Sequence, residues 1–363
     1  MASTEMEKQL FLAGVVFIAL LITGADVGGA ASDRRLRGEM AHPPQKLFVF
    51  GDSYADTGNI AKLFSPSWKP PYGITFPKKP FGRFSDGRVL TDYIASFLGI
   101  RSPIPYKYRK FGKKLLPYGM NFAVGGTGVF DTGNFQRNLS LQIDNFFDQL
   151  KEGVFPGPDL GRSTAVVSIA GNDYLYFQNN GGSSEGLKGF IPKVIRQLAL
   201  DLRKIRRLGV AKVAVTNLHP IGCIPSIASS FSYRKCNETT NLAVMYHNGL
   251  LAEAVAELNK NPGGAAEPFV IIDLFSAFKS VLIRGKPPPL LKHMMNSSEA
   301  LRPCCEAANG GFGCGSTDEN GAPKYTVCKD PGSKFYWDSV HPSQAGWAAV
   351  VSFLGNSLRS LLP

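Results

Sequence analysis

Several features that would indicate other classes of protein are missing from this sequence of 363 residues. Outside residues 10–25 no apolar run is long enough to cross a membrane. The cysteines form no C-x-x-C pair of the kind that is typical of zinc sites. Zinc-finger spacing, an RNP-type aromatic motif and a basic helix with heptads are also missing, so nucleic acid is a poor candidate partner.

The chain also lacks an internal repeat and a linker rich in Pro, Gly and Ser, and we therefore expect one domain. Its apolar content of 44% is ample for a packed core. Short apolar runs alternate with helical patterns, which predicts a three-layer α/β/α fold with a mostly parallel sheet. The expected strands are 46–50, 120–124, 164–170, 210–217 and 269–273, and the expected helices are 86–99, 139–150, 187–208, 241–259, 276–284 and 343–361.

The N-terminal region has the pattern of a secretory signal. An apolar run, Leu10 to Ala25, is followed by small residues at Gly28 to Ala31, as cleavage by signal peptidase requires. We interpret residues 1–30 as a signal peptide and 31–45 as a polar lead-in to a folded domain at 46–363. A short membrane anchor is the alternative for the apolar run.

The cysteines and sequons also favour export to the extracellular space. Six cysteines favour three disulfides, and we expect Cys223 to pair with Cys236 because they bracket one loop. Pairing among Cys304, Cys305, Cys314 and Cys328 stays open, and a zinc cluster formed by these four is an alternative. Glycosylation sequons begin at Asn138, Asn237 and Asn296.

Charge and aromatic content suggest two further expectations. The net charge of +12 attracts anions, so acidic polysaccharide or a membrane surface is a plausible extracellular partner, and a merely soluble basic surface is the alternative. Residues 64–84 are rich in Pro and aromatic side chains without periodicity. We expect this segment to line a groove beside Ser53, although packing onto the core would also account for it.

Residues suited to acyl transfer follow the expected strands. Ser53 comes directly after the first strand, Gly126 and Asn172 lie in the turns expected after the next two, and Asp338 precedes His341 by three residues. Acyl transfer needs a hydroxyl, a neutral imidazole, a carboxylate that orients the imidazole, and donors for the oxyanion. Because parallel strands end at one edge of a sheet, these groups are expected to meet there. No metal or organic cofactor is needed.

A G-x-S-x-G motif, typical of the nucleophile elbow of α/β-hydrolases, occurs at residues 182–186. It follows Gln178-Asn179-Asn180 rather than a strand, and we therefore expect Ser184 to lie in a flexible loop without a catalytic role.

Four blocks of the sequence resemble those of the GDSL or SGNH hydrolases, in the same order. The blocks are Gly51-Asp52-Ser53, the glycine turn at Gly126, Gly171-Asn172-Asp173, and Asp338-x-x-His341. Stretches such as 80–88, 121–126 and 217–225 resemble the plant GDSL esterase/lipase branch. The resemblance covers nearly the whole mature chain and implies an SGNH-hydrolase-like, flavodoxin-like fold.

The resemblance also implies roles for particular residues. Ser53 would be the nucleophile, His341 the general base and acid, and Asp338 the orienting carboxylate. The backbone N–H groups of Ser53 and Gly126 and the side-chain amide of Asn172 would form the oxyanion hole. Tyr54 stands where the family name has Leu, which bears on packing beside the nucleophile.

The expected function is therefore that of a secreted serine esterase or lipase-type hydrolase that works through an acyl-enzyme. An acyltransferase uses the same groups, and the sequence does not separate the two. A non-catalytic extracellular protein that binds cell-wall polysaccharide through residues 64–114 is the alternative from a different class. The ester substrate stays open among lipid, acetylated polysaccharide and phenolic ester.

Overall fold

A computed structural model describes residues 46–133, 138–260, 267–282, 301–308 and 313–362. The expected signal peptide, the lead-in and the sequon at Asn296 lie outside the described residues. No helix in the described part of the chain is both long enough and apolar enough to cross a membrane.

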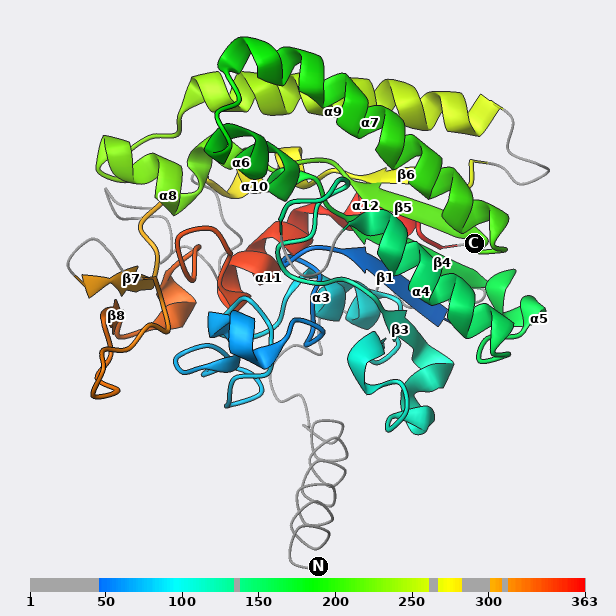
Figure 1. Cartoon of the computed structure of the whole chain (residues 1–363), viewed down its shortest axis with the longest axis horizontal. Helices are drawn as coiled ribbons and strands as arrows, with labels where there is room; N and C mark the ends of the chain where they lie inside the picture. The colour runs from blue at the N-terminus through cyan, green and yellow to red at the C-terminus, as the bar shows by residue number, and fades with distance from the viewer. Residues whose placement is uncertain (1–45, 134–137, 261–266, 283–300, 309–312, 363) are drawn as a thin grey trace, which may run out of the picture.

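A six-stranded parallel sheet forms the centre of the fold, in the order β2-β3-β1-β4-β5-β6 (Figure 1). The α/β class predicted from the alternating pattern is confirmed. The strands are β1 (Lys46–Gly51), β2 (Ile104–Pro105), β3 (Gly119–Asn121), β4 (Ser163–Ser168), β5 (Lys212–Thr216) and β6 (Phe269–Ile272). The strand β1 lies between β3 and β4 and is buried along its whole length, as its continuous apolar sequence predicts.

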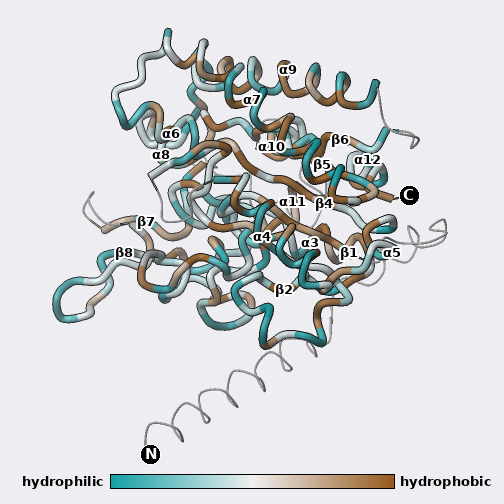
Figure 2. Tube along the Cα trace, turned by 45° about the vertical axis from the view of Figure 1, so that its right-hand side comes forward, coloured by the Kyte–Doolittle hydropathy of each residue, from teal (hydrophilic) through white to brown (hydrophobic). Residues whose placement is uncertain are grey.

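Helices cover both faces of the sheet, and β1 shows how the sequence divides between them. Phe48 and Phe50 pack with α4 (Leu139–Lys151), α7 (Ser184–Arg207) and α9 (Glu238–Lys260). Leu47 and Val49 pack with α3 (Leu90–Phe97), α10 (Leu274–Leu282), α11 (Gln344–Phe353) and α12 (Gly355–Arg359). The brown, apolar segments of Figure 2 accordingly concentrate along the strands and the inner sides of the helices. The alternation has the period of two residues that a strand requires.

The structure departs from the expected elements at three places. The expected helix 343–361 is broken at Leu354, where Gly355 follows and the helix restarts as α12. The expected turn after β4 is the first turn of a helix, α6 (Gly171–Asn179). The two-residue edge strand β2 is too short to leave a periodic signal.

Three disulfides join the six cysteines. Cys223 pairs with Cys236, as expected, and the open pairings resolve as Cys304–Cys328 and Cys305–Cys314. The alternative of a zinc cluster is wrong, because all four of its cysteines are oxidised. The last two bridges belong to a segment with a short antiparallel hairpin, β7 (Cys305–Ala307) and β8 (Tyr325–Val327).

Candidate active site

Ser53 lies just beyond the carboxyl end of β1, in a turn that depends on Gly51. Gly51 has φ +139°, and a Cβ at this position would lie 2.0 Å from the carbonyl oxygen of Ser168 on β4. The side chain of Gln142 on α4 both accepts from the N–H of Gly51 and donates to its carbonyl, each at 2.8 Å. The turn that carries Ser53 is thus fixed from the neighbouring strand and from a helix.

A continuous chain of hydrogen bonds joins Ser53 to His341 and Asp338. The Oγ of Ser53 lies 2.8 Å from Nε2 of His341, and Nδ1 of the same ring lies 2.9 Å from both carboxylate oxygens of Asp338. A proton on Nδ1 faces the carboxylate and leaves the lone pair of Nε2 facing the serine hydroxyl. This is the tautomer that can take a proton from Ser53.

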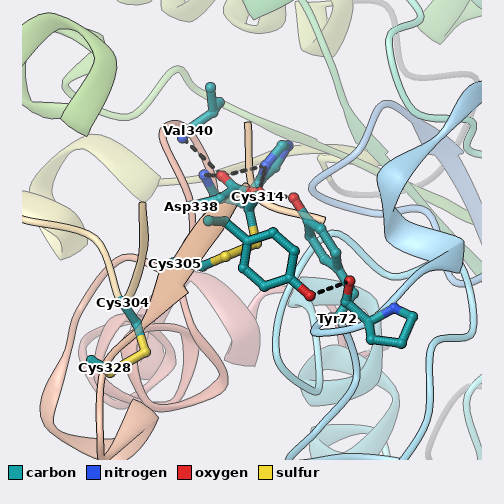
Figure 3. Close-up of a disulfide and its surroundings, with 10 residues drawn as sticks. Tyr72, Cys304, Cys305, Cys314, Cys328, Asp338 and Val340 are labelled. Carbon is teal, nitrogen blue, oxygen red and sulfur yellow. Dashed lines mark hydrogen bonds and ion pairs between the residues drawn. A yellow bond between two sulfur atoms is a disulfide. The ribbon is translucent and has the colours of Figure 1, made fainter. Parts of the chain in front are cut away.

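The Asp338 carboxylate receives further hydrogen bonds that keep it ionised and oriented. The backbone N–H groups of Val340 and His341 donate to Oδ1 at 2.9 and 2.8 Å, and the hydroxyl of Tyr72 donates to Oδ2 at 2.7 Å. Figure 3 shows Tyr72 and Val340 reaching the carboxylate from different sides. Burial alone would raise the pKa of Asp338, but His341 and the backbone hydrogen bonds from His341 and Val340 lower it below its usual value.

The disulfide-bonded segment supports the backbone just before Asp338. The N–H groups of Cys304 and Cys305 donate to the carbonyls of Tyr336 and Trp337 at 2.9 and 2.7 Å. Figure 3 shows the Cys305–Cys314 bridge beside Asp338 and the Cys304–Cys328 bridge farther from it. The bridges therefore anchor the strand-like stretch that presents the carboxylate.

Aromatic rings fix the position of the His341 imidazole. The ring of Phe84 lies 4.9 Å from it and that of Tyr54 lies 5.6 Å from it, between ring centres. The hydroxyl of Tyr54 also donates to the carbonyl of Val340 at 2.9 Å. The tyrosine that departs from the family name thus joins the turn of Ser53 to the loop that carries His341.

Asn172 is hydrogen-bonded to the glycine turn that contains Gly126. Asn172 lies in the first turn of α6, and its side-chain amide donates to the carbonyl of Thr127 at 3.0 Å, in the glycine turn that contains Gly126. Since a carboxamide has two N–H donors, a second one is available for a ligand. The backbone of Gly126 has φ +84°, a conformation that favours glycine.

A small cavity of about 60 Å³ opens beside these groups. Ser53 and Asn172 form part of its polar wall. The apolar wall consists of Ile169, Leu175, Leu218, Ile221, Ile224, Leu274 and Val340. The cavity therefore offers an apolar surface next to the serine hydroxyl.

Residues 64–84, expected to line a groove beside Ser53, do not line this cavity. They pack behind the site instead, as the contacts of Tyr72 with Asp338 and of Phe84 with His341 show. The segment is therefore closer to the alternative, in which aromatic residues pack a loop onto the core.

Several other candidate residues have structural contacts. Asp56 accepts hydrogen bonds from the N–H groups of Gly58, Asn59, Ile60 and Gly125, although burial raises its pKa to about 6. Burial likewise raises the pKa of Asp52 to about 7, and its carboxylate accepts from the N–H of Tyr54. Ser184 is exposed and begins α7, with Ser183 as the N-cap, so the expectation of a flexible loop is wrong.

Three residues at the site could not be identified from the sequence. Tyr72, Gln142 and His219 reach it from loops and helices that are distant in sequence from Ser53. His219 lines the cavity and stacks between Tyr54 and Phe278 at 4.9 and 4.8 Å. Burial lowers its pKa to about 3, so its imidazole is neutral at physiological pH. None of the three has a local motif that would single it out.

A serine hydroxyl is hydrogen-bonded to an imidazole, and the imidazole to a carboxylate, at the carboxyl edge of a parallel sheet. This arrangement defines a hydrolase of the serine type. The comparison with protein families narrows this class. The model of the GDSL-like lipase/acylhydrolase family matches residues 47–354, and the chain belongs to this family.

Similar proteins agree with this assignment. One Arabidopsis thaliana protein named GDSL esterase/lipase is 45% identical over 98% of this chain and 98% of its own. A second protein of the same description and organism is 46% identical over 88% of this chain and 89% of its own. Acetylajmalan esterase from Rauvolfia serpentina is 26% identical, over 86% of this chain and 85% of its own. Among solved structures, an acetyl xylan esterase from Geobacillus stearothermophilus matches with a TM-score of 0.38 and 12% identity, over 88% of this chain and 95% of its own. The family match and the identity to the two Arabidopsis proteins confirm the resemblance to the plant GDSL esterases/lipases.

Proposed function

We propose that the protein is a secreted esterase of the lipase type that cleaves carboxylic esters through an acyl-enzyme on Ser53. The hydrogen-bonded chain from Ser53 through His341 to Asp338 is the observation that carries the proposal. A fluorophosphonate probe, which reacts with activated serines, tests it directly. Labelling of Ser53 in the wild-type protein is expected, and absence of labelling contradicts the proposal.

The geometry supports a two-stage reaction. In the first stage the Oγ of Ser53 adds to the ester carbonyl carbon, and its proton moves to Nε2 of His341. That proton then passes to the departing alcohol oxygen as the ester C–O bond breaks. In the second stage water gives a proton to Nε2 and adds to the acyl carbon, and Ser53 leaves with the proton as the carboxylic acid is released.

Export of the protein is part of the proposal. Its support is the three disulfides, which persist in oxidising compartments, together with the N-terminal apolar run. Asn138 and Asn237, the sequons in the described residues, each accept a backbone N–H through their side-chain oxygen. Their nitrogen atoms are where we propose that glycans attach.

The amide of Asn172 is proposed to stabilise the oxyanion together with the N–H groups of Ser53 and Gly126. Replacing it in the Asn172→Ala variant should weaken transition-state stabilisation by about 2.7–4 kcal/mol. Steady-state hydrolysis of a p-nitrophenyl ester measures this loss, which should appear in kcat rather than in KM. An unchanged kcat would remove Asn172 from the oxyanion hole.

Tyr72 is proposed to be a positioning residue that holds the carboxylate of Asp338. The Tyr72→Phe variant removes one hydrogen bond to a buried charge, worth about 1.5–3 kcal/mol. We therefore expect kcat for the p-nitrophenyl ester to fall about tenfold or more, with KM nearly unchanged.

Tyr325→Phe is the matched control for Tyr72→Phe. The hydroxyl of Tyr325 donates to the carbonyl of Pro70 at 3.0 Å, so the control loosens the same loop without touching Asp338. An equal loss of kcat in both variants would show that Tyr72 acts only through the stability of the loop.

A further inference from the structure

Positive charge is concentrated in two segments that follow the nucleophile turn. Residues 60–88 and 100–118 together contain twelve Lys or Arg residues and one acid, Asp86, which is buried. Arg83 is buried and paired with Asp92, outside these segments. Eight of the remaining cations are exposed: Lys62, Lys69, Lys78, Arg101, Lys107, Lys110, Lys113 and Lys114.

The two segments meet at the indole ring of Trp68. The Nζ of Lys62 lies 5.1 Å from the centre of this ring, and that of Lys107, from the second segment, lies 5.0 Å from it. The ring of Tyr108 stacks on Phe81 at 6.0 Å, and Lys107 lies 5.9 Å from Tyr108. We call the group Lys62, Trp68, Lys79, Lys107 and Tyr108 the lysine–aromatic surface. Figure 1 shows both segments, in blue and cyan, on the lower side of the molecule.

Cations on this surface repel one another. No carboxylate among the described residues lies within ion-pair distance of Lys62 or Lys107. The pKa of Lys107 is lowered by partial burial and by the charge of Lys62, and that of Lys79 is lowered by the same two causes. An anion on the surface would relieve this repulsion, so the surface is electrostatically suited to an anionic partner.

The lysine–aromatic surface lies next to the glycine turn of the active site. The indole N–H of Trp68 donates to the carbonyl of Ile60 at 2.8 Å, and Nζ of Lys107 donates to the same oxygen at 3.3 Å. The Cδ1 of Ile60 lies 3.1 Å from where a Cβ of Gly125 would be, so Ile60 packs against the glycine turn. A polymer held on this surface would therefore lie near the glycine turn that contains Gly126.

We propose that the lysine–aromatic surface binds an acidic polysaccharide, a chain of uronic acid residues whose esters the active site cleaves. The carboxylates would pair with the lysines, while the C–H faces of the sugars pack on the aromatic rings. The choice of an extracellular polysaccharide as the partner rests on the secretion proposed above. Its binding to the surface does not depend on catalysis by Ser53.

An anionic membrane fits these observations less well. Adsorption to a membrane requires a broad apolar face that inserts among the lipids. Among the side chains between residues 60 and 118 whose burial the structure describes, the exposed large apolar ones are Leu63, Ile74 and Phe111, and they are far apart in the sequence. Anionic lipids are also concentrated in the cytoplasmic leaflet, which a secreted protein does not meet.

The test measures binding in a Ser53→Ala background, so that no polymer is hydrolysed during the experiment. The probes are polygalacturonate, the same polymer with its carboxylates methyl-esterified, and vesicles of phosphatidylcholine with phosphatidylglycerol. We expect binding to polygalacturonate that weakens as salt is added, because the charges are exposed. Equal binding to the neutral polymer, or tighter binding to the vesicles, overturns the proposal.

Two sets of substitutions locate the surface. A variant with Lys62→Gln, Lys79→Gln and Lys107→Gln should bind polygalacturonate about tenfold more weakly or worse. A second, with Lys110→Gln, Lys113→Gln and Lys114→Gln, alters exposed lysines on the neighbouring turn and should weaken binding by a smaller factor. If the first variant does not fold, retention of full affinity by the second contradicts the proposal.

The matched control removes the same number of charges from α7, with Lys188→Gln, Lys193→Gln and Arg196→Gln, all exposed. This variant should keep its affinity for polygalacturonate, and an equal loss would assign binding to net charge alone. With Ser53 restored, the surface variants should still hydrolyse a small neutral ester at the wild-type rate. Failure of the surface proposal would appear in the binding measurements, whereas failure of the proposed esterase activity would appear as no hydrolysis of the small ester. The two are therefore distinguished.

Discussion

The Ser53→Ala variant should lose hydrolysis of a short-chain p-nitrophenyl ester by a factor of about 10⁴ to 10⁶ in kcat. In the proposed mechanism the hydroxyl 2.8 Å from Nε2 of His341 forms the covalent intermediate, and alanine offers no replacement for it. The side chain is small and lies at the end of β1, so its removal leaves the packing of the strand intact. Kinetics together with a thermal melt separate lost chemistry from lost folding.

Ser184→Ala is the natural control for the loss at Ser53. Ser184 lies in the G-x-S-x-G motif, but it is exposed at the start of α7 and has no strand before it. Its substitution should leave both kcat and fluorophosphonate labelling unchanged. If activity instead survives in Ser53→Ala and disappears in Ser184→Ala, the nucleophile has been assigned to the wrong serine.

Local patterns predicted the elements that carry the site. The buried run from Lys46 to Phe50 became β1, and the turn that follows presents Ser53 as expected. The spacing of three residues between Asp338 and His341 correctly predicted that the carboxylate reaches the ring. Both are short-range features, in which the geometry of one turn fixes where the side chains point.

The surroundings of the site depend on contacts between distant segments, which the sequence does not show. Tyr72 donates to a carboxylate 266 residues further along the chain, and Gln142 holds Gly51 across 91 residues. Asn172 was expected in a turn because the apolar run before it ends at glycine, but the chain continues there as α6. Tertiary packing decides such positions, and a single sequence carries no signal for them.

Replacing the triad carboxylate by an amide, in the Asp338→Asn variant, should lower kcat by about 10⁴. Asp338 accepts hydrogen bonds from two backbone N–H groups, from Tyr72 and from the ring of His341. An asparagine can accept through only one atom, and its NH₂ group would face donors. The imidazole then favours the tautomer with its proton on Nε2, which cannot take a proton from Ser53.

Asp330→Asn provides the same substitution in a comparable turn outside the site. Its carboxylate accepts from the N–H of Gly332 at 2.8 Å and is exposed, so an asparagine oxygen can replace it and kcat should not change. Fluorophosphonate labelling of Asp338→Asn should slow in parallel with kcat, because both reactions need the same proton transfer. Slow ester hydrolysis with labelling at the wild-type rate would mean that Asp338 serves substrate binding, and that another group orients His341.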